Sequence, residues 1–357
     1  MDFMKNIIDV QIRNTTGNTN TTDLNTILIL AKHTVFTAPE RFRIYRDAAA
    51  AKSDGFPEKG YVYKALLSAF SQQYRPALVV VANGLAADAN ASAYVTAFNE
   101  MQTITQGWLW MVSDLRVAAD QLTLAKAVQA TEKFYAIGTS DAAAIDASKA
   151  TDIGSLIQKE QITQAYAWFD VPDVDLVTYS ATEIALLARC AGKVAGTVQF
   201  LLKELIGVPS PDSMVKTDTH QATLTAKGYT FAAVGNRKVY SYGAGKVGNG
   251  DWIDIRLVMT WTTVNIRERV FRTVTSLDKL GMENDGAATI ESDVRSVLME
   301  GRDLGMFSRD APIIVTVPDV TTLDPAVRHD RILPRVEFEA QLTGAIIGTV
   351  IRGSVYE

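Results

Sequence analysis

Apolar and polar side chains alternate without interruption over residues 336–343. Every second side chain of a β-strand lies on the same face, so this pattern predicts a half-buried strand. Its apolar positions are Val336, Phe338, Ala340 and Leu342. A second β-prone run, residues 345–352, follows Gly344. Because no later segment of the sequence could pair with this run, it needs a partner from elsewhere.

The start of the chain has the same character. Apolar residues alternate with polar ones there, at Ile8, Val10 and Ile12. Residues 14–22 are asparagine, threonine and one glycine, a composition that predicts a flexible tether because it cannot bury enough apolar surface to fold. Both β-prone ends present backbone groups that need hydrogen-bond partners. Pairing within one molecule and pairing between molecules both fit the sequence.

Between these ends, residues 23–202 alternate short β-prone runs with helical stretches. From Leu78 onward the runs are roughly thirty residues apart, the length of a βαβ unit. A helical stretch between two of them places Tyr94, Phe98 and Met101 on one face. This alternation predicts an α/β layered domain with a largely parallel sheet. The candidate strands are residues 27–30, 78–82, 108–112, 134–137, 165–169 and 197–201.

The pattern changes after Pro209 and Pro211, and the remainder predicts a second, α+β domain. In its first long helix, Arg269 and Arg272 lie opposite an apolar stripe made of Ile266, Val270, Val274 and Leu277. The predicted helices are residues 217–227, 262–280 and 286–304, and the predicted strands are residues 229–234, 238–242, 252–257 and 313–317. The expected division of the chain is residues 1–22, 23–202, 203–343 and 344–357.

Composition excludes several classes of function. The chain has 357 residues, 47% of them hydrophobic, and its length favours two domains. A net charge of -5, with basic residues spread along the chain, makes nucleic acid a poor candidate partner. No apolar run approaches the roughly 18 residues of a membrane span, and no secretion signal is recognisable. The single cysteine, Cys190, permits no internal disulfide, and its apolar helical context predicts a small buried residue.

One motif suggests cofactor chemistry. Residues 243–250 satisfy G-x-G-x-x-G, but a dinucleotide fingerprint must open directly into a helix. The β-prone residues 252–257 follow instead, so the sequence predicts a glycine loop between strands. Three histidines, at His33, His220 and His329, are too far apart in sequence for zinc-ligand spacing. We therefore predict no catalytic residue, cofactor or metal site.

Several separate motifs resemble the conserved end of contractile tail sheath proteins. One reads G-x-x-G-N-G-x-W-I-D over residues 245–254, and another runs from Leu333-Pro334 through the alternating strand to residue 346. Residues 63–81 are similar to an aromatic helix that precedes a central strand in these proteins. The remaining matching positions are Trp261, residues 267–271, Asp285, Gly286 and Ile290. The family comprises the sheaths of myophages, with relatives in phage-like bacteriocins and type VI secretion.

The resemblance implies a structural protein of the α/β class with two domains. An inner α+β domain, built from both chain ends, would lie nearest an inner tail tube, with the middle α/β domain outside it. Extended terminal β arms would add strands to sheets of neighbouring subunits, and the sheath would contract to drive the tube through the host envelope. The implied partners are further copies of the chain, the inner tube protein, and baseplate and neck or terminator proteins. The implied location is the virion tail, after assembly in the host cytoplasm.

With the resemblance, pairing between molecules becomes the favoured explanation of the two β-prone ends. The expected arm residues are Ile8, Val10, Ile12, Ala345, Ile347, Thr349 and Ile351. Arg269 and Arg272 are the candidates for contact with an acidic tube surface. The competing hypothesis is a nucleotide-binding α/β enzyme that uses the glycine loop at residues 243–250.

Overall fold

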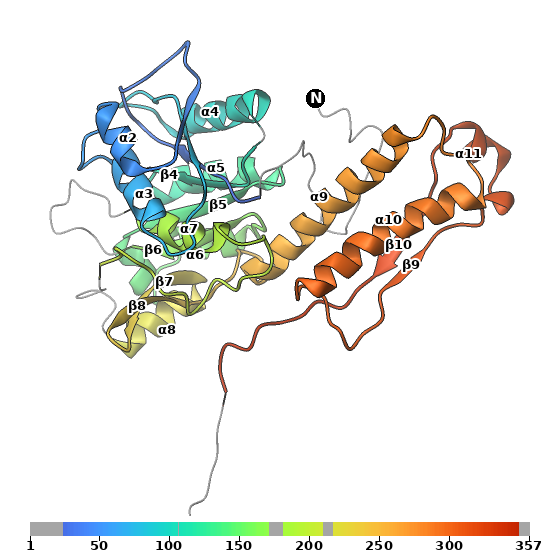
Figure 1. The fold of residues 1–357 in the computed structure, drawn as a ribbon. Helices are drawn as coiled ribbons and strands as arrows, with labels where there is room; N and C mark the ends of the chain where they lie inside the picture. The colour runs from blue at the N-terminus through green and yellow to red at the C-terminus, as the bar shows by residue number, and fades with distance from the viewer. Residues whose placement is uncertain (1–23, 106, 171–180, 210–216, 350–357) are drawn as a thin grey trace, which may run out of the picture.

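The computed structural model describes residues 24–105, 107–170, 181–209 and 217–349. Figure 1 shows a layered α/β body and a slender unit, in orange and red, that extends away from it. We call these parts the large domain, residues 24–257, and the small unit, residues 258–343. The helix α9 (Ile253–Ser276) begins in the large domain and continues into the small unit.

An eight-stranded sheet forms the centre of the large domain. The strand order is β2-β3-β1-β4-β5-β6-β7-β8. Neighbouring strands from β3 to β7 are parallel, and the edge strands β2 and β8 are antiparallel to their neighbours. This confirms the predicted, largely parallel sheet. The strands are β1 (Ile27–Leu30), β2 (Phe42–Tyr45), β3 (Val79–Ala82), β4 (Trp110–Ser113), β5 (Phe134–Thr139), β6 (Ala165–Phe169), β7 (Tyr229–Gly235) and β8 (Lys238–Gly243).

Helices cover both faces of this sheet. In β1, Ile27 and Ile29 face one core, whereas Leu28 and Leu30 face the other, and all four are fully buried. Strands buried on two faces are apolar throughout, which explains why they are visible in the sequence. One face packs against α2 (Ala48–Ser53), α3 (Tyr61–Phe70) and α7 (Glu183–Ala191), and the other against α4 (Ala91–Ile104), α5 (Ala118–Gln129), α6 (Ile153–Lys159) and α8 (Asp218–Ala226).

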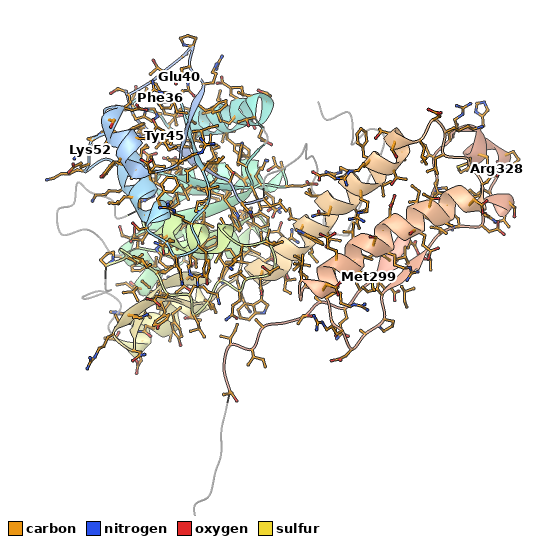
Figure 2. All side chains as sticks on the ribbon, viewed as in Figure 1. Phe36, Glu40, Tyr45, Lys52, Met299 and Arg328 are labelled. Atoms are coloured by element: carbon orange, nitrogen blue, oxygen red, sulfur yellow. The ribbon has the colours of Figure 1, made fainter. Side chains whose placement is uncertain are left out.

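The edge strand β2 is not among the predicted strands. It is short and partly exposed, so its sequence lacks the apolar run of a central strand. Nearby aromatic side chains hold it, with the rings of Tyr45 and Phe56 6.1 Å apart and those of His33 and Phe36 4.8 Å apart. Figure 2 labels Phe36 and Tyr45 beside α2.

Two expectations about the end of the large domain are corrected. Residues 197–201 are not a strand, because Phe200 and Leu201 enter the core from an irregular segment. The predicted strands at 229–234 and 238–242 exist as β7 and β8, but they continue the large sheet, since β7 pairs with β6. The edge of that sheet therefore does not coincide with the expected boundary at residues 202–203.

The start of α9 is a further correction. Residues 252–257 are not a strand, because α9 begins at Ile253, about ten residues earlier than expected. Ile253 and Leu257 are four residues apart, so they share one helical face and pack into the large-domain core. This tertiary contact favours a helix and outweighs the preference of these residues for a strand. A helix of 24 residues is about 36 Å long, long enough to connect the two parts.

The small unit has its own core. Helix α10 (Asn284–Asp303) packs beside α9 and covers a two-stranded sheet of β9 (Ile314–Thr316) and β10 (Glu337–Glu339). These elements correspond to the predicted helix 286–304 and the predicted strands 313–317 and 336–343. Two short helices complete the unit, the 3-10 helix η2 (Val320–Thr322) and the α-helix α11 (Pro325–His329). Leu277, expected on the apolar stripe, lies beyond the end of α9 and is 45% exposed. The buried core residues are Val258, Trp261, Ile266, Val270, Val294, Val297, Leu298, Met306, Phe307 and Val315.

Two classes of site are not found in the part of the chain that the structure describes. None of its helices is long and apolar enough to cross a membrane. Nor does any group of three or more His, Cys, Asp or Glu side chains gather there in an arrangement that could hold a metal ion.

Candidate assembly site

The C-terminal segment leaves the small unit at Gly344. Up to that point it is held by backbone hydrogen bonds, with Ser308 N donating to Gln341 O at 2.7 Å and Thr343 N to Met306 O at 2.9 Å. Residues 344–349 form no strand, and Ile346 is 88% exposed. Figure 1 shows this segment running away from both parts of the molecule. The expectation that residues 336–343 belong to the subunit's own sheet is confirmed for Glu337–Glu339, which pair with β9, and Leu342 adds an isolated bridge to Phe307.

The two-stranded sheet has an open side along β10. The hydrogen bonds of Gln341 O and Thr343 N show that the N–H and C=O groups of odd-numbered residues point toward residues 306–308 and β9. Exposure alternates without a break over residues 336–343, so the even-numbered residues point their backbone groups the other way. We call this outward side, from Val336 to Leu342, the β10 edge. No other strand of the described chain lies along it.

The opposite side, which we call the β9 edge, is covered. By the same alternation, the carbonyl groups of Ile313 and Val315 point away from β10. Arg295 of α10 reaches both of them, donating from Nη1 to Ile313 O at 3.1 Å and from Nη2 to Val315 O at 3.5 Å. Nη2 also donates to Glu291 Oε1 at 2.6 Å, which fixes the guanidinium in place. A single side chain thus occupies the acceptors of this edge.

The expected arm residues are only partly within the described chain. Ala345, Ile347 and Thr349 lie in the extended segment after Gly344. Ile8, Val10, Ile12 and Ile351 lie outside the described residues. Leu24, where the described chain begins, packs against both the large-domain core and the small-unit core. Pairing of either arm with a neighbour stays a prediction.

The two candidate tube-contact arginines have different surroundings. Arg269 faces α10, where its Nη1 donates to Ser296 Oγ at 2.7 Å and its Nη2 lies 3.3 Å from Glu300 Oε2. Its charge is therefore partly neutralised within the subunit. Arg272, one turn further along α9, is exposed. The structure does not test a tube contact of either residue, but it makes Arg272 the more available cation.

The glycine loop at residues 243–250 is a packed connection between β8 and α9. The helix does follow the loop closely, so the sequence argument against a cofactor site was incomplete. However, six backbone N–H groups in and directly after the loop already donate to protein acceptors, so they are not free to cradle a phosphate. A side chain at Gly248 would come within 2.4 Å of Ile157 O, so the loop also lies tightly against the protein. The N–H groups that donate to protein acceptors are those of Ala244, Gly245, Val247, Asn249, Gly250 and Ile253.

A buried ion pair lies where the central strands of the large sheet end. Arg116 follows β4, and its Nη2 donates to Glu183 Oε1 at 3.0 Å, while Tyr61 donates its hydroxyl to the same oxygen at 2.7 Å. Glu183 is fully buried. Burial raises the pKa of Tyr61 well above its usual value, so the hydroxyl keeps its proton. Ligands often bind at this edge of α/β sheets, but here the polar groups bind one another.

No sequence motif indicates this ion pair. Arg116 and Glu183 are 67 residues apart and belong to no motif. A signal was present, because Asp114, Arg116 and Asp170 are charged residues placed directly after apolar strands. Charged residues at that position are expected to meet at one edge of a parallel sheet.

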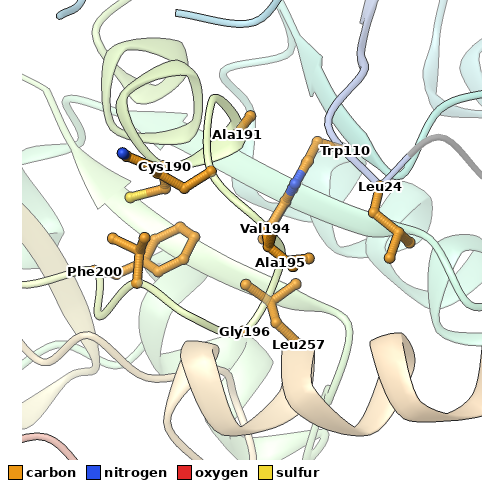
Figure 3. Close-up of a pocket in the computed structure, with 11 residues that line it drawn as sticks. Leu24, Trp110, Cys190, Ala191, Val194, Ala195, Gly196, Phe200 and Leu257 are labelled. Carbon is orange, nitrogen blue, oxygen red and sulfur yellow. The ribbon is translucent and has the colours of Figure 1, made fainter. Parts of the chain in front are cut away.

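A small cavity lies at the joint between α9 and the large domain (Figure 3). It has a volume of about 10 Å³, room for no more than one water molecule, and is lined mainly by apolar residues, including Leu24, Trp110 and Leu257. Cys190 also contributes, and burial raises the pKa of its thiol to about 12. The thiol is therefore protonated at neutral pH, which agrees with the small buried residue expected from the sequence. Few polar groups converge on the cavity, so it is a packing defect at a joint.

A second contact ties α9 to the large domain. Arg267 of α9 pairs with Glu132, before β5, at 3.4 Å, and both side chains are at least nine-tenths buried. Next to Glu132, Lys133 donates from Nζ to the carbonyl of Trp108 and lies over the indole ring. The packing of Leu257 and this ion pair of Arg267 hold α9 against the large domain at two positions along the helix, and so fix the small unit to the large domain.

No family model matches the chain, and no curated protein matches its sequence. Solved structures with the same arrangement of elements come from contractile injection systems, so the chain has a sheath-like α/β fold. One is the helical sheath of the anti-feeding prophage (AFP) in its contracted state, with 12% identity, a TM-score of 0.68, and coverage of 97% of this chain and 99% of that chain.

Two further structures agree. The sheath complex of the extracellular contractile injection system PVC, also contracted, matches with 9% identity and a TM-score of 0.68 over 97% of this chain and 96% of that chain. A chain of the AFP baseplate matches with 11% identity and a TM-score of 0.66 over 98% of both chains. Because each match spans nearly the whole of both chains, the large domain and the small unit both belong to the shared fold.

Proposed function

We propose that this protein is the subunit of a contractile sheath that polymerises around an inner tube and contracts to drive the tube through a target envelope. The observation that carries the proposal is the sheath-like fold over nearly the whole chain, in two sheaths solved in the contracted state. The extended segment after Gly344 supports it, because an exposed β-prone run is suited to pairing with another subunit.

Strand exchange explains how such a polymer could hold together while its subunits move. Backbone hydrogen bonds give about 0.5–1.5 kcal/mol each, so a short strand contributes only a few kcal/mol. One joint is weak, but many joints act together in a lattice by avidity. Gly344 and Gly348 leave the segment free to bend between subunits, and neither would meet another atom if it carried a side chain. The joints can therefore persist while the domains rotate.

The proposal includes partners that the fold does not identify. They are the inner tube protein, a baseplate, and neck or terminator proteins, in a phage tail or a phage-like injection system assembled in the cytoplasm. For the tube contact we propose Arg272, with a lesser share for Arg269 because of its pairing with Glu300. Arg272→Glu should weaken co-sedimentation with tubes of the cognate tube protein. Arg328→Glu, at the exposed end of the small unit (Figure 2), is the matched control.

Electron microscopy of the purified full chain tests the function itself. We expect tubular or ring-like polymers at high concentration. A variant lacking residues 345–357 should remain monomeric with an almost unchanged melting temperature, because the described part of that segment is exposed except at the half-buried Ile347. A variant lacking only residues 353–357 keeps the β-prone run and serves as the control. Equal polymer from all three proteins would refute the arm model.

We also propose that the protein has no catalytic activity. The glycine loop, which was the basis of the enzyme hypothesis, uses its N–H groups for internal bonds. A thermal-shift screen with NAD, NADP, FAD, ATP and GTP should leave the melting temperature unchanged. A saturable increase with any of these nucleotides, lost on substitution of Gly245 or Gly248, would restore the enzyme hypothesis.

A further inference from the structure

The two edges of the small sheet differ in what they offer to an incoming strand. The β10 edge presents the backbone groups of Val336, Phe338, Ala340 and Leu342. The β9 edge presents the carbonyls of Ile313 and Val315, and Arg295 occupies both. An unprotected edge is a template for pairing, and proteins cover edges that must stay closed.

We propose that Arg295 is an edge guard. It closes the β9 edge of each free subunit, so that the C-terminal segment of a second copy can add only to the β10 edge. This inference rests on the proposed function, because it specifies where the strand exchange of that function takes place. It assigns Arg295 a role in selecting the docking position, not in the stability of the fold.

The geometry of Arg295 supports a guard rather than a core contact. Its side chain is 43% exposed, so it buries little apolar surface. Glu291, one turn earlier on α10, holds the guanidinium by a 2.6 Å hydrogen bond. The guanidinium then spans two carbonyls of one strand, the acceptors that an added strand would need. An incoming strand would have to displace a charged, doubly bonded group before it could pair.

The occupant of the β10 edge follows from the path of the chain. Residues 344–349 leave β10 from its end and extend away from that strand. Thirteen residues, 345–357, follow Gly344, which is more than enough to cover the seven residues 336–342. The solvent face of β10 carries Glu337 and Glu339, and the segment carries Arg352, an opposite charge for a cross-strand pair.

A peptide titration tests the guard. The probe is a synthetic peptide of residues 344–357, added to the full-length chain at a concentration where that chain is monomeric. Calorimetry should give one peptide per wild-type chain and two per Arg295→Met chain, because the substitution frees the two carbonyls. Arg302→Met removes the same charge from the same helix and should keep one peptide per chain. Arg295→Lys retains a donor and should give a second site about tenfold weaker than the first.

A second variant addresses the open edge. Ala340→Pro removes an N–H that points away from β9, and proline is tolerated on a free edge. This variant should keep its melting temperature within a few degrees and lose the first peptide site. If the fold of this variant is disturbed, the number of peptides bound per Arg295→Met chain still tests whether Arg295 blocks the β9 edge.

The outcomes separate the guard from the proposed function. If wild-type chains bind one peptide and Arg295→Met chains also bind one, the guard is wrong and strand exchange stands. If Arg295→Met chains lose the single site, Arg295 is part of the acceptor and the guard is also wrong. If no chain binds the peptide and none polymerises, both the guard and the function proposed for the segment are refuted.

Discussion

The two sheets of this protein close their edges by different means. In the large sheet, residues 202–205 cover β8, with Leu205 N donating to Val239 O at 2.9 Å and Ser241 N to Lys203 O at 2.9 Å. In the small sheet, Arg295 covers the β9 edge, and no strand of the described residues lies along the β10 edge. A segment of chain closes the β8 edge of the first sheet, whereas the β9 edge of the second sheet is closed by one side chain.

This difference separates folding from assembly. The eight-stranded sheet has helices on both faces, and a segment of the same chain pairs with its β8 edge. A two-stranded sheet is only marginally stable by itself, and here it gains stability from α9 and α10 on one side. Added strands would complete it. We therefore expect substitutions in the large domain to act on stability, and substitutions in the small unit to act on assembly as well.

The largest effect should come from the buried ion pair of the large domain. Arg116→Met leaves the fully buried carboxylate of Glu183 without its cation, which destabilises folded proteins by about 3–5 kcal/mol. Denaturant unfolding should report this loss. Arg41→Met is the control, because both partners of the Arg41–Glu100 pair are about half exposed, and its loss should be below about 1 kcal/mol. Similar losses in both variants would contradict the role given to burial.

A smaller loss should follow in the small unit. Leu298 is fully buried in its core, and Leu298→Ala should lower the unfolding free energy by about 3 kcal/mol. Hydrogen exchange should place the loss in residues 258–343 and leave the large sheet protected. Met299→Ala is the control, because Met299 is 37% exposed on α10 (Figure 2). Equal loss of protection in both parts would mean that they unfold as one unit.

Ser241 tests the covered edge of the large sheet. Its hydroxyl, fully buried, accepts from Lys203 N at 3.0 Å and donates to Phe200 O at 2.7 Å. Ser241→Ala leaves both backbone groups without that partner, at a cost of about 2 kcal/mol. The amides of residues 202–205 should then exchange faster. Ser276→Ala, at the exposed end of α9, is the control. Unchanged amide exchange in Ser241→Ala would show that the pairing of residues 202–205 with β8 does not depend on the Ser241 hydroxyl.

Sequence patterns predicted the elements whose burial is uniform. The central strands are buried on both faces and are therefore apolar runs, as in β3 with its sequence VVVA. Residues 336–343 alternate because one face packs on the small-unit core and the other is solvated. The start of α9 could not be predicted this way, because Ile253 and Leu257 fit either a β-prone run or a helical face. Only contact with the large-domain core decides between them.

The candidate site was predicted only in part, for a related reason. The boundary at Gly344 follows from local pattern, since alternation stops there. The role proposed for Arg295 depends on Ile313, 18 residues away, across a helix and a loop. The pair of Arg116 and Glu183 likewise joins distant elements. One sequence contains the residue types of such contacts but not their distances, so these side chains could be recognised only in the folded chain.

The last prediction concerns pH, which should act on the large domain and not on the small unit. Lys133 is fully buried, and burial lowers the pKa of its amine from 10.5 to about 7. Between these pH values the unfolded chain holds a proton that the folded chain has released. The unfolding free energy therefore rises with pH in this window, by at most about 1.4 kcal/mol per unit. Below pH 7 both states are protonated, and the full cost of burying the charge remains.

Lys133→Met keeps the length of the side chain and removes the titrating group, so it should flatten this rise. Unfolding free energies measured in denaturant at pH 6, 7.5 and 9 would show a shallower dependence than in the wild type, with the variant gaining most at pH 6. Lys126→Met is the control, because Lys126 and its partner Glu160 are both partly exposed. This variant should retain the wild-type dependence of the unfolding free energy on pH. If Lys133→Met also retained the wild-type pH dependence, the amine of Lys133 would be charged in the folded wild-type protein, stabilised by the Trp108 carbonyl and ring. Hydrogen exchange at the same pH values would locate the effect in the large sheet, because Lys133 directly precedes β5.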